Sequence, residues 1–333
     1  MAQINELAPN TTDDHQGRLA YVPDDLLPKT ITTEMFAKIQ ENSLVARLGR
    51  RIPVSFGETV IPVNVKRPEV GQVGTGTTNA QREGATKPLT GVAWDSKVMQ
   101  PIKLAAIVTV SEEFARTNPQ GFYSQLQSDL AFAMGRGIDL AVFHGKQPLT
   151  GGALLGIDAS NVLNNTTKIV NTDTVTDNNL FDELIAAYGL VTADDFDFDG
   201  WAVDTRFRPR LITEGAERDV NGNLVNPGQI NLAAAQAGNI LGFPAQYGKA
   251  VRGDLGAATA TTTQMIGGEF QQLAWGFADN IRYKISDQAT LTDGTNTVSM
   301  WQTNQVALLV EATFGWVVGD LDAFVKVINP SGS

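Results

Sequence analysis

Apolar residues recur every three or four positions between residues 119 and 144, which predicts one long helix. The recurring positions are Phe122, Leu126, Leu130, Met134, Ile138 and Ala141 or Val142. Pro119 favours a helix start because proline lacks the N–H that would be unpaired at the first position. Gly145 favours a helix end. At 1.5 Å per residue this helix would be roughly 39 Å long, which is long for an ordinary domain.

Short apolar runs on both sides of this helix have the length of strands. The runs lie at residues 60–65, 103–110, 168–170, 201–203, 305–318 and 323–328. Six of the eight residues of 103–110 are apolar, which predicts a buried strand. Residues 180–191 return to the helical spacing, and residues 208–212 begin another helical turn. Because helices and strands do not alternate regularly, the fold class predicted is α+β.

A long Gly-rich and Thr-rich stretch, residues 67–97, separates two of these strands. Loops of this length inside a compact domain are unusual and tend to be functional or disordered. We expect a flexible two-stranded arm, a shape suited to reaching a neighbouring subunit. Trp94 lies in this polar arm, and we expect its ring to be buried at the base of the arm or against another subunit.

Local signals predict the remaining organisation. Residues 1–17 are polar without apolar periodicity, which predicts a disordered tail. Thr32 or Thr33 can cap a helix over residues 34–41. The dipeptides Asn221-Gly222 and Asp293-Gly294 predict β-hairpin turns.

Composition excludes several classes of protein. The 333 residues are 42% apolar, and no run approaches the roughly 20 residues that span a bilayer. The polar N-terminus lacks the pattern of a secretory signal, so we expect folding in a cytoplasm. The net charge of −11 argues against a protein that grips nucleic acid. It is compatible with a protein that encloses nucleic acid, and it would keep subunits soluble before assembly.

The residues needed for catalysis or metal binding are scarce. The chain has no cysteine and only two histidines, His15 and His144. We expect His144, at the end of the long helix, to be an imidazolium that complements the helix dipole. Residues 195–200 match the opening of a calcium loop, but its twelfth position is Arg206, so we interpret them as a solvated acidic turn. No nucleotide-binding loop or nucleophile motif is present, and we predict no enzyme activity, cofactor or metal site.

Two groups of charged residues are candidates for contacts between subunits. The basic cluster of Arg47, Arg50 and Arg51 could meet acidic groups of a neighbour or cap the end of a helix. The arm carries both signs of charge, which suits inter-subunit ion pairs but also an ordinary solvated loop. The predicted contact residues are Arg47, Arg50, Arg51, Arg82, Glu83, Lys87 and Trp94.

From about residue 18, the order of these segments resembles the major capsid protein of tailed bacteriophages, which has the HK97-like fold. The resemblance rests on an N-terminal arm, a long hairpin over residues 60–110, and Val108-Thr109-Val110-Ser111-Glu112-Glu113 leading into a long spine helix. It continues with Trp201-Ala202-Val203-Asp204 and a helix, and ends with Gly315-Trp316-Val317-Val318 and Asp322-Ala323-Phe324-Val325-Lys326. Each motif is weak alone, whereas their order and spacing are specific.

The resemblance implies a division of the chain into six parts. They are a tail (1–17), an N-terminal arm (18–59), an extended-loop hairpin (60–110), a peripheral domain with the spine helix (111–155), an axial domain (156–275), and C-terminal strands returning to the peripheral domain (276–333).

It also implies assembly through pentamers and hexamers into an icosahedral shell that encloses double-stranded DNA without sequence-specific binding. The expected partners are further copies, a portal, possible decoration proteins and a scaffolding protein. Because the arm begins within about 20 residues, we expect the scaffold to be a separate protein or to be dispensed with. The expected location is the virion capsid, assembled in the host cytoplasm and not in a membrane.

Two alternatives remain open at this point. An encapsulin-like compartment shares the fold but encloses an enzyme cargo. A β-rich carbohydrate-binding protein could use the Asn-rich and Thr-rich loops, although it lacks supporting motifs.

Overall fold

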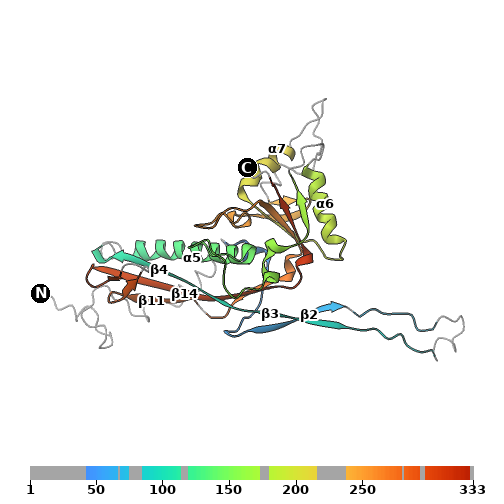
Figure 1. The fold of residues 1–333 in the computed structure, drawn as a ribbon, viewed down its shortest axis with the longest axis horizontal. Coiled ribbons are helices and arrows are strands. Elements are labelled where there is room, and N and C mark those ends of the chain that lie inside the picture. The colour runs from blue at the N-terminus through green and yellow to red at the C-terminus, as the bar shows by residue number, and fades with distance from the viewer. Residues whose placement is uncertain are drawn as a thin grey trace.

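The computed structural model describes most of the chain, and every structural statement below concerns these residues: 43–66, 68–74, 85–113, 119–172, 180–215, 238–279, 281–292 and 297–330. Three parts are visible in Figure 1. A long helix, α5, lies along a five-stranded sheet, and we call this part the first lobe. A six-stranded sheet with α6 and α7 stands beside it and forms the second lobe. A hairpin of β2 and β3 projects away from both lobes.

The helices are short except for α5 and α6. The α-helices are α2 (Leu44–Leu48), α5 (Pro119–His144), α6 (Leu180–Thr192) and α7 (Arg208–Gly215). The 3-10 helices are η4 (Ala159–Asn161), η5 (Leu163–Asn165), η6 (Thr205–Phe207), η7 (Lys249–Val251), η8 (Phe270–Gln272) and η9 (Leu321–Ala323).

The strands form two large sheets and two hairpins. The five-stranded sheet contains β1 (Arg50–Arg51), β10 (Leu273–Phe277), β14 (Gln305–Val318), β11 (Arg282–Ser286) and β4 (Ile102–Ser111). The six-stranded sheet has the order β5 (Ile169–Asn171), β15 (Phe324–Ile328), β9 (Thr263–Gly268), β6 (Gly200–Val203), β8 (Phe243–Tyr247) and β7 (Asn239–Ile240). The hairpins pair β2 (Thr59–Lys66) with β3 (Ala93–Met99), and β12 (Thr290–Thr292) with β13 (Thr297–Ser299).

The long helix confirms the sequence prediction at both ends. It spans 26 residues from Pro119 to His144, and Gly145 follows it with a positive φ of 63°. Leu130, Met134 and Ile138 are buried in the main hydrophobic cluster, which also contains residues of β14 and β10. Near its C-terminal end the helix is buried on all sides because both lobes cover it there. Both lobes therefore pack against this end of α5.

The predicted cationic role of His144 is wrong. Its Nε2 lies 2.9 Å from the carbonyl oxygen of Val251, and burial lowers the pKa of His144. Because a neutral imidazole is favoured in this environment, Nε2–H donates to that carbonyl and the side chain links α5 to η7.

β14 is the central strand of the first lobe. It pairs antiparallel with β4 on one edge over ten residues and with β10 and β11 on the other. The prediction that this segment is a buried strand is wrong for one face of β4, because its residues alternate between partly buried and exposed. Ile107 is 53% exposed. The partly buried side chains of β4 pack against the cluster under α5, and within the described residues its other side chains are exposed.

The C-terminal strands divide between the two lobes. We expected residues 276–333 to return together to the part that carries the long helix. β14 does so, whereas β15 pairs with β9 and β5 in the second lobe. β15 carries Val325 and Val327, which are fully buried in the second hydrophobic cluster under α6. Burial of these side chains explains why the last strand leaves the first sheet.

Several predicted features lie outside the described residues: the tail (1–17), the helix at 34–41 and the turn at Asn221-Gly222. The second predicted hairpin is confirmed by its strands, because Leu291 pairs with Val298 in antiparallel register. Within the ranges given above, no helix is both long enough and apolar enough to cross a bilayer.

Candidate assembly interface

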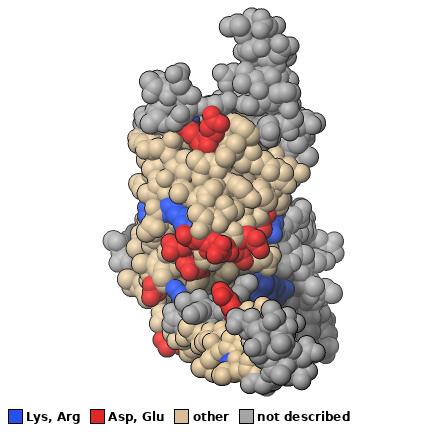
Figure 2. Space-filling view, turned by 90° about the vertical axis from the view of Figure 1, so that its right-hand side faces the viewer, with Lys and Arg blue, Asp and Glu red and all other residues tan. Residues whose placement is uncertain are grey.

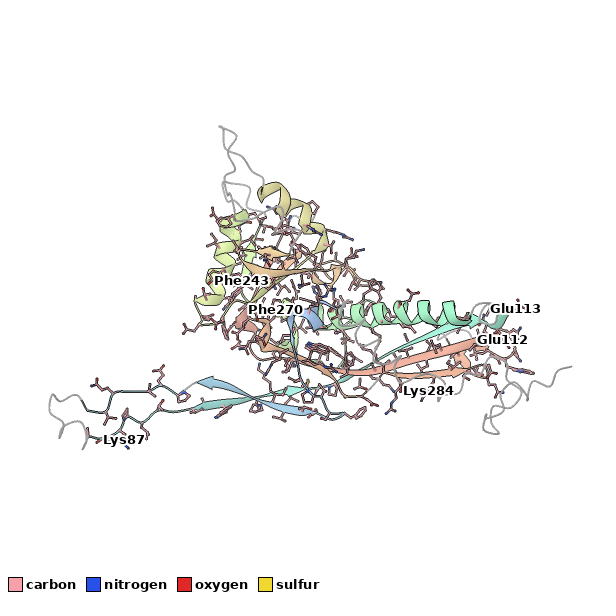
Figure 3. All side chains as sticks on the ribbon, turned by 180° about the vertical axis from the view of Figure 1, so that it is seen from behind. Lys87, Glu112, Glu113, Phe243, Phe270 and Lys284 are labelled. Atoms are coloured by element: carbon pink, nitrogen blue, oxygen red, sulfur yellow. The ribbon has the colours of Figure 1, made fainter. Side chains whose placement is uncertain are left out.

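The hairpin of β2 and β3 is the most exposed part of the described chain. Its strands pair antiparallel from Thr59–Met99 to Lys66–Ala93, and in the described part neither pairs with a third strand. Figures 1 and 3 show it extending well beyond the two lobes. A two-stranded ribbon is at best marginally stable alone in water. The outer edges of β2 and β3 could therefore pair with a further strand, and the faces of the hairpin could pack against another surface.

The root of the hairpin is anchored by Met99. This side chain is fully buried with Ala274 and Val317, and Ile52 and Val54 pack against the same small cluster.

Two glycines make room for this packing. Gly276 in β10 and Gly315 in β14 lie directly opposite each other in the sheet. A Cβ atom added to Gly276 would lie 2.1 Å from the Ile52 oxygen, and one added to Gly315 would lie 3.2 Å from the sulfur of Met99. The backbone of the N-terminal segment and the hairpin root therefore approach the sheet closely at these two positions, where no side chain stands in the way.

Apolar side chains are exposed along the hairpin and its approaches. They are Phe56, Val60, Val70, Leu89, Val92, Trp94 and Val98. Trp94 and Val98 alternate with their neighbours onto one face of β3, and Val60 lies opposite Val98. Trp94 is 65% exposed, so the prediction that it is buried at the base of the arm is wrong for this chain alone. A contact between Trp94 and another subunit stays a prediction.

The charged residues predicted for this arm are only partly described. Lys87 is exposed on the descending limb, far from both lobes (Figure 3). Arg82 and Glu83 lie outside the described residues.

Two arginines of the predicted basic cluster contact other parts of the same chain. Arg47 is in the last turn of α2, where a cation complements the helix dipole, and its Nη1 donates to Oε1 of Gln246 at 3.1 Å. The Arg51 guanidinium lies 6.0 Å from the centre of the Trp275 ring. Arg50 is exposed on β1. These contacts join the N-terminal segment to both lobes, and a contact with a neighbouring copy stays a prediction.

Sequence reasoning missed Asp139, which holds residues 43–45 against the long helix. Its carboxylate is buried in α5 and accepts hydrogen bonds from the Ser43 hydroxyl (2.6 Å), Leu44 N–H (3.0 Å) and Val45 N–H (3.1 Å). Burial raises the pKa of Asp139 to about 6, against the opposing effects of these bonds and of Arg47. A carboxylate in an otherwise apolar stretch of helix was the available signal.

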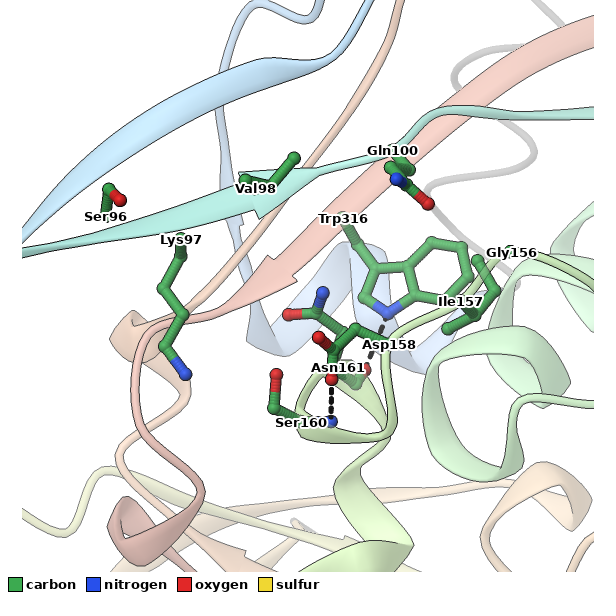
Figure 4. A pocket seen from close by; sticks show the side chains of 10 residues that line it. All are labelled: Ser96, Lys97, Val98, Gln100, Gly156, Ile157, Asp158, Ser160, Asn161 and Trp316. Carbon is green, nitrogen blue, oxygen red and sulfur yellow. Dashed lines mark hydrogen bonds between the residues drawn. The ribbon is translucent and has the colours of Figure 1, made fainter.

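A cavity of about 520 Å³ lies between β3 and the loop at residues 156–161 (Figure 4). Its lining residues are Ser96, Lys97, Val98, Gln100, Gly156, Ile157, Asp158, Ser160, Asn161 and Trp316. Asn161 closes one side, because its carbonyl accepts from Trp316 Nε1 at 2.7 Å and its Oδ1 accepts from Val318 N–H at 3.0 Å. The cavity separates β3 from this loop, so the hairpin is held mainly at its root.

The acidic turn at residues 195–200 is structural. Both oxygens of Asp199 accept backbone N–H groups, from Phe270 at 2.8 Å and Gln271 at 3.1 Å, and so cap η8. Asp199 is partly buried, so the predicted fully solvated turn is wrong at this residue. In the part of the chain that the structure describes, no three His, Cys, Asp or Glu side chains are placed to hold a metal ion.

Known proteins are similar to this chain in both sequence and fold. The model of the phage capsid family matches residues 24–328. The chain is 28% identical over 305 residues to the probable major capsid protein gp17 of Mycobacterium phage D29, covering 89% of this chain and 87% of that protein.

Solved structures are similar over most of the chain. A structure from Gordonia phage Cozz has a TM-score of 0.68 and 28% identity, covering 86% of each chain. One from Mycobacterium phage Ogopogo has a TM-score of 0.66 and 26% identity, covering 86% of this chain and 92% of that one. The α+β architecture, with its projecting hairpin and long helix, is the HK97-like fold expected from the sequence. With its family model matched from residue 24 to residue 328, this chain belongs to the phage capsid family.

Proposed function

We propose that this chain is the major capsid protein of a tailed bacteriophage. Its copies assemble through pentamers and hexamers into an icosahedral shell that encloses double-stranded DNA. The observation that carries this proposal is the family match over residues 24–328, supported by a hairpin that projects from the fold with its apolar side chains exposed.

The mechanism of such a protein is assembly. The hairpin offers Trp94, Val98 and Val60 on one exposed face, and burying them against a neighbour removes apolar area from water. The contact is heterologous, because a hairpin on one copy meets a different surface on the next, and a suitable rotation closes such contacts into rings. Many modest contacts in a closed shell then make a stable particle.

The acidic charge suits a container for DNA. A net charge of −11 keeps separate copies soluble and disfavours tight binding to packed phosphates. We place the protein in the virion capsid, assembled in the host cytoplasm, with a scaffolding protein, a portal and decoration proteins as candidate partners. Its role is structural, and we assign it no enzyme activity and no membrane location.

An encapsulin-like compartment is the alternative that shares this architecture. The two functions differ in what the shell contains. Particles should be purified from producing cells, treated with nuclease and then opened. Nuclease-protected double-stranded DNA supports the phage capsid, whereas a stoichiometric protein cargo without DNA contradicts it.

A further inference from the structure

Helix α6 exposes an apolar face that nothing in the described chain covers. One side of the helix packs on the six-stranded sheet through Leu184, Ala187 and Val191. On its solvent side Ile185 is 45% exposed and Leu190 is 40% exposed. Ala186 and Gly189 are exposed on the same helix, and a Cβ atom at Gly189 would meet nothing within 4 Å. The face is mostly apolar and open, with Ala186 and Gly189 between Ile185 and Leu190, and the exposed Asp182 adds a negative charge one turn before Ile185.

Acidic residues border this helix at one end of the six-stranded sheet. They come from the segment before β6, from the end of β9 and from the segment before β15, and they are Asp194, Asp195, Asp197, Asp199, Glu269, Asp320 and Asp322. Contacts hold these segments together: Asp197 N–H donates to Glu269 Oε2 at 3.3 Å, and Lys168 both pairs with Asp194 at 2.6 Å and donates to the carbonyl of Asp322. Figure 2 shows Asp and Glu gathered across this side of the molecule, with largely uncharged surface above them.

The opposite end of the same sheet is basic. β6 and β8 are parallel, so the residues that follow them lie at the end away from the acidic segments. The basic residues at that end are Arg206, Arg208, Arg210, Lys249 and Arg252. Asp204 and Asp254 lie among them, and Arg206 pairs with Asp254. Since β6 runs only from Gly200 to Val203, roughly 13 Å of sheet separates the two ends.

We propose that the exposed face of α6 with its acidic border docks onto the basic end of the second lobe of the next copy. This inference rests on the proposed shell function and names the surface that builds its rings. Each copy carries both halves, so the contact is heterologous and repeats from copy to copy. The apolar face supplies the buried area, and the opposite charges set orientation and speed of encounter. Salt weakens this contact, because exposed charges are screened.

A charge exchange within one chain tests the pairing. The acidic-end variant is Asp195→Asn with Asp197→Lys, in which Asn is chosen because residue 195 has a positive φ of 61° that asparagine tolerates. The basic-end variant is Lys249→Glu with Arg252→Gln. The fourfold variant combines both and restores the net charge of −11. Rings and shells are measured by analytical ultracentrifugation at low salt, with thermal unfolding of the separated chains as a control for folding.

The expected result is that each two-residue variant lowers the assembled fraction at least tenfold and the fourfold variant recovers most of it. The acidic-end variant is informative alone, because it reduces net repulsion between copies and would assemble better if overall charge were decisive. Unchanged assembly of the two variants overturns the inference, and so does a fourfold variant that stays as poor as its parents. If the unaltered chain forms no rings or shells even with a scaffolding protein present, the proposed function fails instead.

The helix face is tested separately with Ala186→Arg. The site is exposed and arginine is a good helix former, so the separate chain should keep its unfolding temperature. Assembly should fall at least tenfold, because a long charged side chain would stand in the contact. Ala133→Arg is the matched control, since it places the same side chain on an exposed position of α5, outside the proposed contact, and should leave assembly within twofold. Normal assembly of Ala186→Arg contradicts docking through α6.

Discussion

The hydroxyl of Ser43 donates a 2.6 Å hydrogen bond to Oδ1 of Asp139, across 96 positions of sequence. With the N–H groups of Leu44 and Val45, it makes this buried carboxylate the cap of helix α2. The charge is retained in a place where burial disfavours it, because three donors converge on it. Asp139 thus ties the N-terminal segment to the middle of the long helix.

Asp139 should make the stability of the folded chain depend on pH. Its folded pKa of about 6 is raised above the unfolded value of about 3.9. Between those pH values the folded chain holds a proton that the unfolded chain has released. The contribution of protonated Asp139 to the free energy of unfolding is therefore largest at low pH and is lost as pH rises through 6.

Asp139→Asn cannot titrate. The free energy of unfolding of the natural chain, relative to that of this variant, should decrease by about 2 kcal/mol between pH 4 and pH 7. Urea unfolding of both unassembled chains at several pH values measures this difference. Parallel pH profiles for the two chains would show that Asp139 does not titrate as described.

Gly276→Ala should loosen the root of the hairpin. The new Cβ atom would lie 2.1 Å from the Ile52 oxygen, which no small adjustment relieves. We expect a loss of about 2–3 kcal/mol in the free energy of unfolding, as for an overpacked core site. Gly57→Ala is the control, because its Cβ meets nothing within 4 Å and should change stability by about 0.5 kcal/mol or less. Equal stabilities of the two variants would contradict the close packing over the glycine pair.

Trp94→Ser separates assembly from folding. Trp94 is largely exposed on the hairpin, so its loss should change the stability of the single chain by about 0.5 kcal/mol or less. If it is an anchor in a neighbour's surface, particle yield should fall at least tenfold, since such residues contribute about 2 kcal/mol or more. Trp301→Ser removes a similarly exposed ring away from the hairpin and serves as the control. Equal particle yields from both variants would exclude a specific role for Trp94.

Asn161→Ala should destabilise the end of β14. The substitution removes Oδ1 and leaves the buried N–H of Val318 without its acceptor. The expected cost is about 1–3 kcal/mol. Asn165→Ala is the matched control, because Asn165 is exposed and donates its side-chain hydrogen bond to the carbonyl of Ala159. A melting temperature of Asn161→Ala no lower than that of the control would contradict this account.

The elements that the sequence predicted best have strong local signals. The helix from Pro119 to His144 has a proline start, a regular apolar spacing and a glycine end. The half-exposed β4 was missed because its apolar sequence does not show which face another element covers. β15 was placed with β14 because the two are neighbours in sequence, whereas burial of Val325 and Val327 decides its sheet.

Sites that depend on distant pairs could not be predicted. Asp139 and Ser43 are 96 positions apart in sequence and meet only in the folded chain. The acidic and basic ends of the second lobe follow from the parallel pairing of β6 with β8. Trp94 is exposed within one chain, so whether its ring is buried against another subunit stays a prediction.

Assembly is tested most directly by the mass of the purified chain, measured by light scattering with negative-stain images of the same sample. We expect closed shells, or rings of five and six copies, at low salt and with a scaffolding protein present where one is needed. A chain that stays monomeric under all these conditions, with the hairpin packed on its own lobes, would contradict the shell function.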